Sequence, residues 1–119
     1  MSDRRPWPTE VRLDKAKTTL TVTFDSGETF GLPAEYLRVE SPSAEVQGHG
    51  PAQKQVVGGK RSVKIAGLEP VGNYAVRVLF DDGHDTGLFS WDYLHELGRD
   101  HDARWTAYTH ALKAKHLAR

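Results

Sequence analysis

The sequence contains no cysteine among its 119 residues and only one methionine. Without thiols the chain by itself can form neither a disulfide nor a cysteine-ligated zinc or iron–sulfur site, and it has no thiolate nucleophile. It also lacks net charge, because 16 basic and 16 acidic residues cancel. A neutral chain has no global field to steer it to nucleic acid or to an anionic membrane, so these partners are disfavoured.

Long apolar stretches are absent as well. No run approaches the roughly 20 residues of a membrane span, and no apolar segment follows the two arginines of MSDRRPWPTEV as a secretory signal requires. We therefore expect a cytoplasmic protein with no membrane contact. A length of 119 residues favours a single domain, residues 1–119, in which we expect residues 1–10 to form a loose N-terminal arm.

The first part of the chain has the pattern of a small antiparallel sheet followed by a helix. Apolar and polar residues alternate in LTVTF, which indicates a half-buried strand over 18–24, and the DSG turn connects it to a strand over 28–32. A first strand is expected at 11–14. The segment LPAEYLR predicts a short helix with Pro33 in its first turn and with Leu32, Tyr36 and Leu37 toward the core.

The second part also has the pattern of antiparallel strands, and helices are expected at its end. Strands are expected over 62–68 and 74–80, with alternate residues from Tyr74 to Phe80 on one face, and an extended segment over 84–89. Ser90 fits the N-cap of a helix that Gly98 would end, and Asp100 fits the cap of a last helix reaching about residue 117. The order predicts an α+β fold: antiparallel β-sheets with a short helix and two C-terminal helices packed on one side.

A long loop over 44–61 separates the two parts. Its second half and the three residues that follow carry cations and no acid: Lys54, Lys60, Arg61 and Lys64. The functional interpretation is a contact with an anion or a partner, and the structural one is a solvated loop. Gly58, Gly59 and Lys60 lack the GxxxxGK[ST] spacing of a phosphate-binding loop.

The strongest cluster of candidate ligands is DDGHD, which contains Asp81, Asp82, His84 and Asp85. Together with His49 from the GHG loop it would offer two histidines and a carboxylate, a set that suits zinc or non-haem iron. The same residues also suit an ordinary hairpin turn, in which the aspartates favour the turn and Gly83 supplies a positive φ.

Acidic residues dominate the stretch from 81 to 102. Only Arg99 opposes seven acids there, and a field of this sign could attract a cation or a basic partner, or belong to a solvated turn and helix start. The basic segment at 54–64 could pair with it within one molecule or between two.

Two longer segments carry a family resemblance: LPAEYLRVESPSAEVQGHG and LEPVGNYAVRVLFDDGHDTGLFSWDYLHELG. They resemble the DUF971 family, the gamma-butyrobetaine hydroxylase-like N-terminal domain. In hydroxylases of carnitine synthesis a similar domain binds a structural zinc and precedes an oxygenase barrel that holds iron and 2-oxoglutarate. Related domains are joined to P-loop ATPases that carry iron–sulfur clusters. Because no barrel is present here, the resemblance does not imply oxygenase activity for this chain.

The zinc ligands implied by the family are mostly replaced. The resemblance places three cysteines after the LR dipeptide, where this sequence has Ser41, Ser43 and Val46, and one histidine, which matches His84. Serine is a far weaker zinc ligand than thiolate, and valine is none. The inherited zinc site is therefore expected to be lost.

These observations together predict a non-catalytic accessory or binding module without a resident cofactor. The predicted face for a ligand or partner contains His49, Asp82, His84, Asp85, Trp91 and Tyr93. Its partner would be a protein, such as an iron–sulfur ATPase or an oxygenase, or a second copy in a homo-oligomer. The alternatives are a zinc or iron site at His49, His84 and Asp85, and an accessory role in iron–sulfur cluster assembly through a partner's cysteines.

Overall fold

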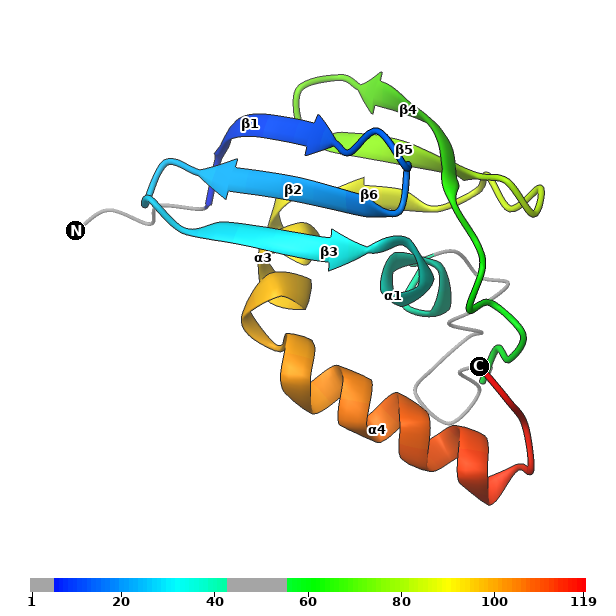
Figure 1. Ribbon diagram of the computed structural model, residues 1–119. Coiled ribbons are helices and arrows are strands. Elements are labelled where there is room, and N and C mark those ends of the chain that lie inside the picture. The colour runs from blue at the N-terminus through cyan, green and yellow to red at the C-terminus, as the bar shows by residue number, and fades with distance from the viewer. Residues whose placement is uncertain (1–5, 43–55) are drawn as a thin grey trace.

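Two three-stranded antiparallel sheets form the upper layer of the molecule, and two C-terminal helices lie beneath them in the computed structural model (Figure 1). The structure describes residues 6–42 and 56–119. Its elements are β1 (Pro8–Leu13), β2 (Thr19–Phe24), β3 (Thr29–Pro33), α1 (Ala34–Val39), β4 (Ile65–Val71), β5 (Ala75–Phe80), β6 (Leu88–Ser90), α3 (Trp91–Arg99) and α4 (His101–Ala114). The predicted α+β class, with helices packed on one side, is confirmed.

The first sheet has the order β1-β2-β3, and its centre is the predicted alternating strand. Leu20, Val22 and Phe24 of β2 are buried while the intervening threonines are half-buried, as period-2 alternation requires. One expectation was wrong here. Strand β1 begins at Pro8, which pairs with Phe24, so residues 8–10 belong to the sheet and not to a loose arm.

The second sheet has the order β4-β5-β6 and differs from the sequence prediction in one strand position and in the position of Tyr74. The predicted strand over 62–68 is shifted to Ile65–Val71. Val76, Val78 and Phe80 of β5 are buried as expected, but Tyr74 lies in the turn before the strand and is 57% exposed. The alternation therefore does not extend to Tyr74, because the turn at Gly72 breaks the pleat that would have carried its ring inward.

The two sheets share one core with the helices. The apolar faces of β2 and β5 meet, and Leu94 and Leu97 of α3 complete the cluster with no exposed surface of their own. A backbone hydrogen bond from Ile65 N to Lys17 O (2.9 Å) ties the second sheet to the first. In the part of the chain that is described, no helix has the length and apolar character needed to cross a membrane.

Helix α3 starts as predicted and ends differently. Ser90 is its N-cap and accepts a hydrogen bond from Tyr93 N (3.1 Å), with Asp92 in the first turn. Gly98, however, lies inside the helix, which continues to Arg99. It is needed for packing: a Cβ at this position would overlap the Phe30 ring of β3.

Helix α4 follows after a single residue. Asp100 occupies its N-cap position but makes no side-chain cap hydrogen bond, since its carboxylate instead binds Arg99 (3.0 Å). The helix ends at Ala114, and its predicted apolar stripe is formed by buried Tyr108 and Leu112 with half-buried Trp105. Tyr108 donates its hydroxyl hydrogen bond to Val57 O (2.6 Å), which holds the segment before β4 against the helix.

Candidate functional site

His84 and Ser41 meet where the β5–β6 turn packs on the end of α1. Ser41 Oγ lies 3.0 Å from His84 Nε2, and the two residues are 0% and 5% exposed. Gly87 permits this contact, because a Cβ at Gly87 would overlap Ser41 Oγ. The two positions that the sequence resemblance matches to a cysteine and a histidine ligand of zinc are thus joined directly by a hydrogen bond.

Asp82 binds two cations beside this pair. Its Oδ2 atom lies 2.8 Å from Arg38 Nε and 2.6 Å from Lys60 Nζ, and its Oδ1 atom accepts a hydrogen bond from His84 N (3.1 Å). Burial alone raises the pKa of Asp82, but the hydrogen bonds from Lys60, the His84 backbone and Arg38 outweigh it and lower that pKa to about 2. Asp82 therefore remains ionised and clamps three segments of the chain together.

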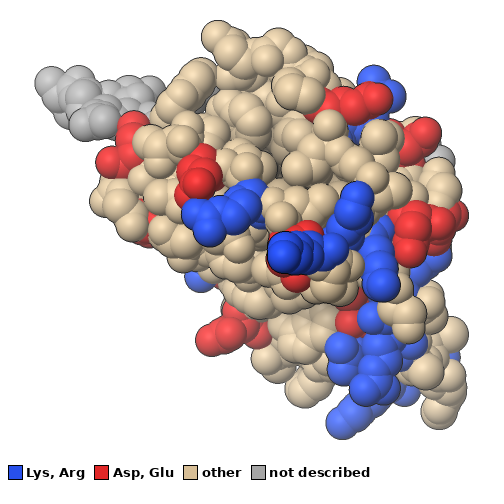
Figure 2. Space-filling model, turned by 45° about the horizontal axis from the view of Figure 1, so that its top comes forward, with Lys and Arg blue, Asp and Glu red and all other residues tan. Residues whose placement is uncertain are grey.

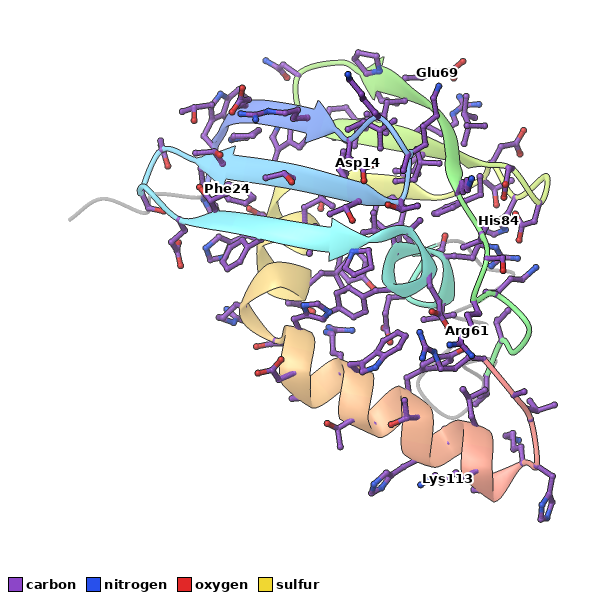
Figure 3. All side chains as sticks on the ribbon, viewed as in Figure 1. Asp14, Phe24, Arg61, Glu69, His84 and Lys113 are labelled. Atoms are coloured by element: carbon purple, nitrogen blue, oxygen red, sulfur yellow. The ribbon has the colours of Figure 1, made fainter. Side chains whose placement is uncertain are left out.

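Arg38 and Lys60 were not predicted as site residues. The acid-free segment at 54–64 was the available signal for Lys60, and the observed pairing shows that this segment meets the acidic stretch within one molecule. Lys64 N adds a second link by donating to Asp81 Oδ1 (3.0 Å). No local sequence pattern indicated Arg38 as a site residue. Its Nη1 atom is buried without a hydrogen-bond partner in the described part of the chain. Figure 3 shows His84 at the turn end of the hairpin, above Arg61.

The arrangement of Ser41, His84 and Asp82 does not make a hydrolytic triad. In such a triad the carboxylate accepts from the histidine ring and orients it. Here Asp82 Oδ1 binds the backbone N–H of His84, and Oδ2 is engaged by Arg38 and Lys60. Ser41 also has no exposed surface from which it could reach a substrate. These contacts fit a structural role, in which the buried Ser41–His84 hydrogen bond holds the β5–β6 turn on the end of α1. We call this contact the Ser41–His84 lock.

A metal centre does not fit the described donors. Among residues 6–42 and 56–119 there is no group of three or more histidines, cysteines or acids placed to hold a metal ion. His84 Nε2 faces Ser41, the Asp82 carboxylate binds cations, and Asp85 is exposed. His49, Ser43 and Val46 lie outside the described residues, so the zinc or iron site at His49, His84 and Asp85 stays a prediction.

Tyr93 belongs to a partly buried polar network that sequence reasoning missed. Its hydroxyl donates to Glu40 O (2.5 Å), and the Glu40 carboxylate binds Arg104 Nη1 of α4 (2.9 Å), which also pairs with Glu96. Burial, followed by the nearby Glu40 carboxylate, raises the pKa of Tyr93 to about 12. Tyr93 thus joins α1, α3 and α4, and its hydroxyl is used inside the molecule.

Trp91 lies in a different environment, with aromatic neighbours. Its indole Nε1–H donates to Asn73 O (2.8 Å), and its backbone N–H donates to Tyr74 O (3.2 Å). Trp91 and Tyr74 line a pocket of about 190 Å³ together with Trp7, and the remaining lining residues are Pro6, Ser90 and Asp92. Trp7 and Tyr74 are 48% and 57% exposed, so this pocket sits in an exposed aromatic surface.

The predicted face is therefore divided between two ends of the β5–β6 hairpin. Asp82, His84 and Asp85 occupy the turn, whereas Trp91 follows β6 beside the first residue of β5, which pairs with Ser90. The six residues of β5 separate these ends by about 20 Å. The structure brings Asp82 and His84 together with Arg38, Lys60 and Ser41, and it brings Trp91 together with Trp7 and Tyr74.

A basic surface adjoins the Asp82 site, because Lys60 of the 58–64 segment binds Asp82. Figure 2 shows blue side chains gathered at the lower right of the molecule, where the C-terminal end of α4 lies. No acid occurs after Asp102, and this tail meets the acid-free 58–64 segment through the hydrogen bond from Gly59 N to Ala118 O (2.9 Å). One group of cations therefore lies where this tail meets the 58–64 segment.

Similar structures exist for nearly the whole chain. Two proteins solved by NMR in solution have TM-scores of 0.83, at 43% identity over 100% of this chain and 89% of the other, and at 46% identity over 98% and 91%. A crystal structure of a protein of unknown function from Acidithiobacillus ferrooxidans ATCC 23270, which belongs to the DUF971 family, has a TM-score of 0.67 and 40% identity over 82% and 98%. None of the curated proteins matches.

The sequence pattern of one family covers most of the chain. The pattern described as gamma-butyrobetaine hydroxylase-like, N-terminal matches residues 11–95, which include all the strands after the start of β1 and the first turn of α3. The resemblance seen in the EPVGNYA and DDGHDTGLFSWDYL segments is thereby confirmed. The chain belongs to the gamma-butyrobetaine hydroxylase-like N-terminal family, also called the DUF971 family.

Proposed function

We propose that this chain is a non-catalytic binding module that contacts a protein partner through its aromatic surface, defined by Trp7, Tyr74, Leu88 and Trp91. The observation that carries the proposal is the exposure of large apolar side chains in one region. Trp7 and Tyr74 are 48% and 57% exposed and line one pocket with Trp91, and Leu88, which is 43% exposed, lies on β6, the strand that leads to Trp91. Aromatic residues that gather at a surface are the side chains that most often dominate protein interfaces.

The positions of these residues support a preformed contact surface. The Trp91 indole is held by Asn73 O, and Trp7 is held through its carbonyl, which accepts from Asp25 N (2.8 Å). Leu88 and Ser90 lie on one face of β6, opposite buried Phe89. A surface that is rigid before binding loses less conformational entropy when a partner docks.

The non-catalytic part of the proposal rests on the Ser41–His84 lock. The groups that could perform acid–base or nucleophilic chemistry there are buried or engaged by one another. The partner classes suggested by the family resemblance, an iron–sulfur ATPase and an oxygenase, remain proposals. The family name refers to the N-terminal part of hydroxylase-like proteins, which supports a role beside a larger catalytic protein.

The test places a photo-reactive amino acid at position 74 in the full chain and, as a control, at position 117, because Leu117 is also an exposed apolar residue (44%) but lies at the C-terminal end. A partner is expected to cross-link at 74 and not at 117. Binding of that purified partner should fall about tenfold or more in Tyr74→Ala and stay unchanged in Leu117→Ala. Equal cross-linking at both positions, or unchanged binding in Tyr74→Ala, would refute the proposal.

A further inference from the structure

Two cations of the acid-free segment lie beside a polar pocket that the proposed binding role does not use. Arg61 and Lys64 line this pocket of about 390 Å³ together with the start of β2 and the start of α1. Both residues are exposed, and neither side chain forms an ion pair within the described part of the chain. The neighbouring cations Arg38 and Lys60, in contrast, both bind Asp82. The two charges at the pocket are therefore available to an anion.

The acid in the pocket wall is already balanced by another cation. Among the described residues that line the pocket, Glu35 is the only acid, and its two carboxylate oxygens accept hydrogen bonds from Arg119 Nη2 (2.8 Å) and Nε (3.1 Å). Two further acids lie nearby: Asp14 accepts from Thr18 N (2.7 Å), and Asp81 accepts from Lys64 N (3.0 Å). The charges of these two carboxylates lower the net attraction, so we expect weak, millimolar binding of a single anionic group.

Backbone contacts fix the segment that carries the two cations. Val63 N donates to Lys60 O (3.1 Å), which closes a turn with Arg61 at its second position. Lys64 N donates to Asp81 Oδ1 (3.0 Å), and Lys64 O accepts from Asp81 N (2.9 Å). Val63 itself is 8% exposed and belongs to the core. Arg61 and Lys64 therefore extend from a backbone that is set before a ligand arrives, which lowers the entropic cost of binding.

The donors at this pocket match a phosphoryl group. The planar guanidinium of Arg61 offers parallel N–H donors to two phosphate oxygens, and the Lys64 ammonium adds a compact charge. Thr19 and Ser62 bring hydroxyl groups that can donate as well, whereas the Thr18 hydroxyl already donates to Asp14 Oδ2 (2.8 Å). A phosphoryl group presents three terminal oxygens to this set, and a carboxylate presents only two.

The shape of the pocket favours a small ligand over a polymer. A volume of about 390 Å³ lies within the range of about 300–1,000 Å³ typical of sites for small molecules. Its apolar lining is limited to Pro33, Ala34 and Val63, so the ligand is expected to be compact and mostly polar. A nucleic acid needs a continuous basic face, and Asp14 beside Thr18 and Asp81 beside Lys64 interrupt such a face.

We infer that this pocket binds the phosphoryl group of a small phosphorylated molecule, with Arg61 and Lys64 as its cationic contacts. The site lies at the other end of β2 from the aromatic surface. Thr19, which lines the pocket, begins β2, whereas Trp7 O accepts from Asp25 N just after β2 ends. The inference thus goes beyond the proposed binding role and does not depend on it, because a ligand here leaves the aromatic surface open to a partner.

The experiment is an NMR titration of the full chain with sodium phosphate at pH 7, compared with sodium chloride at matched ionic strength. The backbone amide signals of residues 61–64 should shift and saturate with a dissociation constant on the order of 1–10 mM. Signals of α3 should stay in place and serve as internal control. Glycerol 3-phosphate should bind at least as tightly as inorganic phosphate, because its ester keeps three terminal oxygens, and glycerol should not bind.

Matched variants identify the groups that bind. Arg61→Gln and Lys64→Gln should each weaken phosphate binding about fivefold or more. Arg61→Lys should preserve only part of the binding, because an ammonium lacks the fork of the guanidinium. Lys113→Gln is the control: it makes the same change in net charge at an exposed residue on α4, away from Arg61 (Figure 3), and should leave the dissociation constant unchanged. Thermal unfolding in chloride shows that each variant is folded.

Three results would overturn the inference. Equal shifts in phosphate and chloride remove the site, and equal losses in Arg61→Gln and Lys113→Gln reduce it to general charge attraction. A single-stranded oligothymidine or a tetraglutamate peptide that binds about a hundredfold more tightly than phosphate would assign the surface to a polyanion instead. Tyr74→Ala should bind phosphate as the wild type does, so the phosphate site and the proposed partner surface are tested separately.

Discussion

Asp82 connects parts of the chain that are far apart in sequence. Its carboxylate receives Arg38 from α1, Lys60 from the segment before β4, and the backbone of His84. Because its pKa in the folded protein is about 2, below the ordinary value of 3.8, this carboxylate stabilises the fold fully above pH 4. Solvent screens this accessible carboxylate, so the contribution is about 1 kcal/mol, and it is lost as the pH falls from about 4 through about 2.

Asp82→Asn should therefore remove the part of the acid sensitivity that lies in this range. At pH 7 the variant should also lose about 2–4 kcal/mol of unfolding free energy, because Arg38 is left buried without its carboxylate. Urea unfolding between pH 2 and pH 7 measures both effects. Asp81→Asn is the control, since the amide oxygen can still accept from Lys64 N. Parallel pH profiles for wild type and Asp82→Asn would contradict this account.

The Ser41–His84 contact leads to a second prediction at this scale. Ser41→Ala removes a buried hydrogen bond of 3.0 Å and should lower the unfolding free energy by about 1–3 kcal/mol. Ser26→Ala, which removes an exposed hydroxyl that donates to Glu28, should have a much smaller effect.

The Ser41–His84 contact also leads to a prediction about whether the protein binds zinc or iron. If the serine–histidine contact is a structural lock, untagged protein purified without chelators should contain zinc and iron only well below one ion per chain. Elemental analysis of the wild type and of His84→Ala tests this. Stoichiometric metal that is lost in the variant would instead support a metal site at His84 and would reopen catalysis as a function.

Helix α3 contacts several separate parts of the fold. Its N-terminus is capped by Ser90, its buried face supplies Leu94 and Leu97 to the core, and the Leu97 carbonyl accepts the Tyr36 hydroxyl (2.7 Å). Near its C-terminal end it approaches β3 so closely that only glycine fits against Phe30. Trp91 at its start belongs to the aromatic surface.

Gly98→Ala tests this close approach. Alanine is the better helix former by about 1 kcal/mol, so an exposed position would gain stability. Here the added methyl group overlaps the Phe30 ring, and overpacking costs about 1–3 kcal/mol. We expect Gly98→Ala to lower the free energy of unfolding measured with urea. In the double variant with Phe30→Leu the smaller side chain should relieve the overlap, so the combined loss should be smaller than the sum of the two single losses. A stabilised Gly98→Ala protein would show that α3 and β3 can separate freely.

At the scale of the whole molecule, the C-terminal segment is tied back to the first helix. Arg119 makes two hydrogen bonds to the Glu35 carboxylate (3.1 and 2.8 Å), and its guanidinium lies 5.2 Å from the centre of the Trp105 ring. Glu35 is buried with 6% exposure, while the Arg119 side chain is 43% exposed. The contact joins the segment after α4 to α1, and its Arg119 side is partly exposed to solvent.

Arg119→Ala should lower the unfolding free energy by about 1–2 kcal/mol, because Glu35 loses its cation while solvent screens part of the effect. Thermal unfolding at low and high salt measures it, and the difference between wild type and variant should shrink as salt increases. Lys115→Ala, an exposed cation in the same tail, should leave stability nearly unchanged. Equal losses in the two variants would indicate a general charge effect.

Local patterns by themselves determined the fold class and most element positions. Alternation located β2 and β5, the Ser90 cap located the start of α3, and helical spacing located the buried stripe of α4. These features are readable because they depend on residues a few positions apart. The family could also be named from the sequence, because the resemblance lies in two uninterrupted segments that can be compared without knowing the fold.

Tertiary structure alone decided which distant residues meet. Ser41 and His84 are 43 positions apart, Arg38 and Asp82 are 44 apart, and no local period relates either pair. It also placed Gly98 inside a helix where turn chemistry predicted an end, because the Phe30 ring occupies the space of a side chain. The division of the predicted face had the same cause, since the length of β5 separates Trp91 from His84.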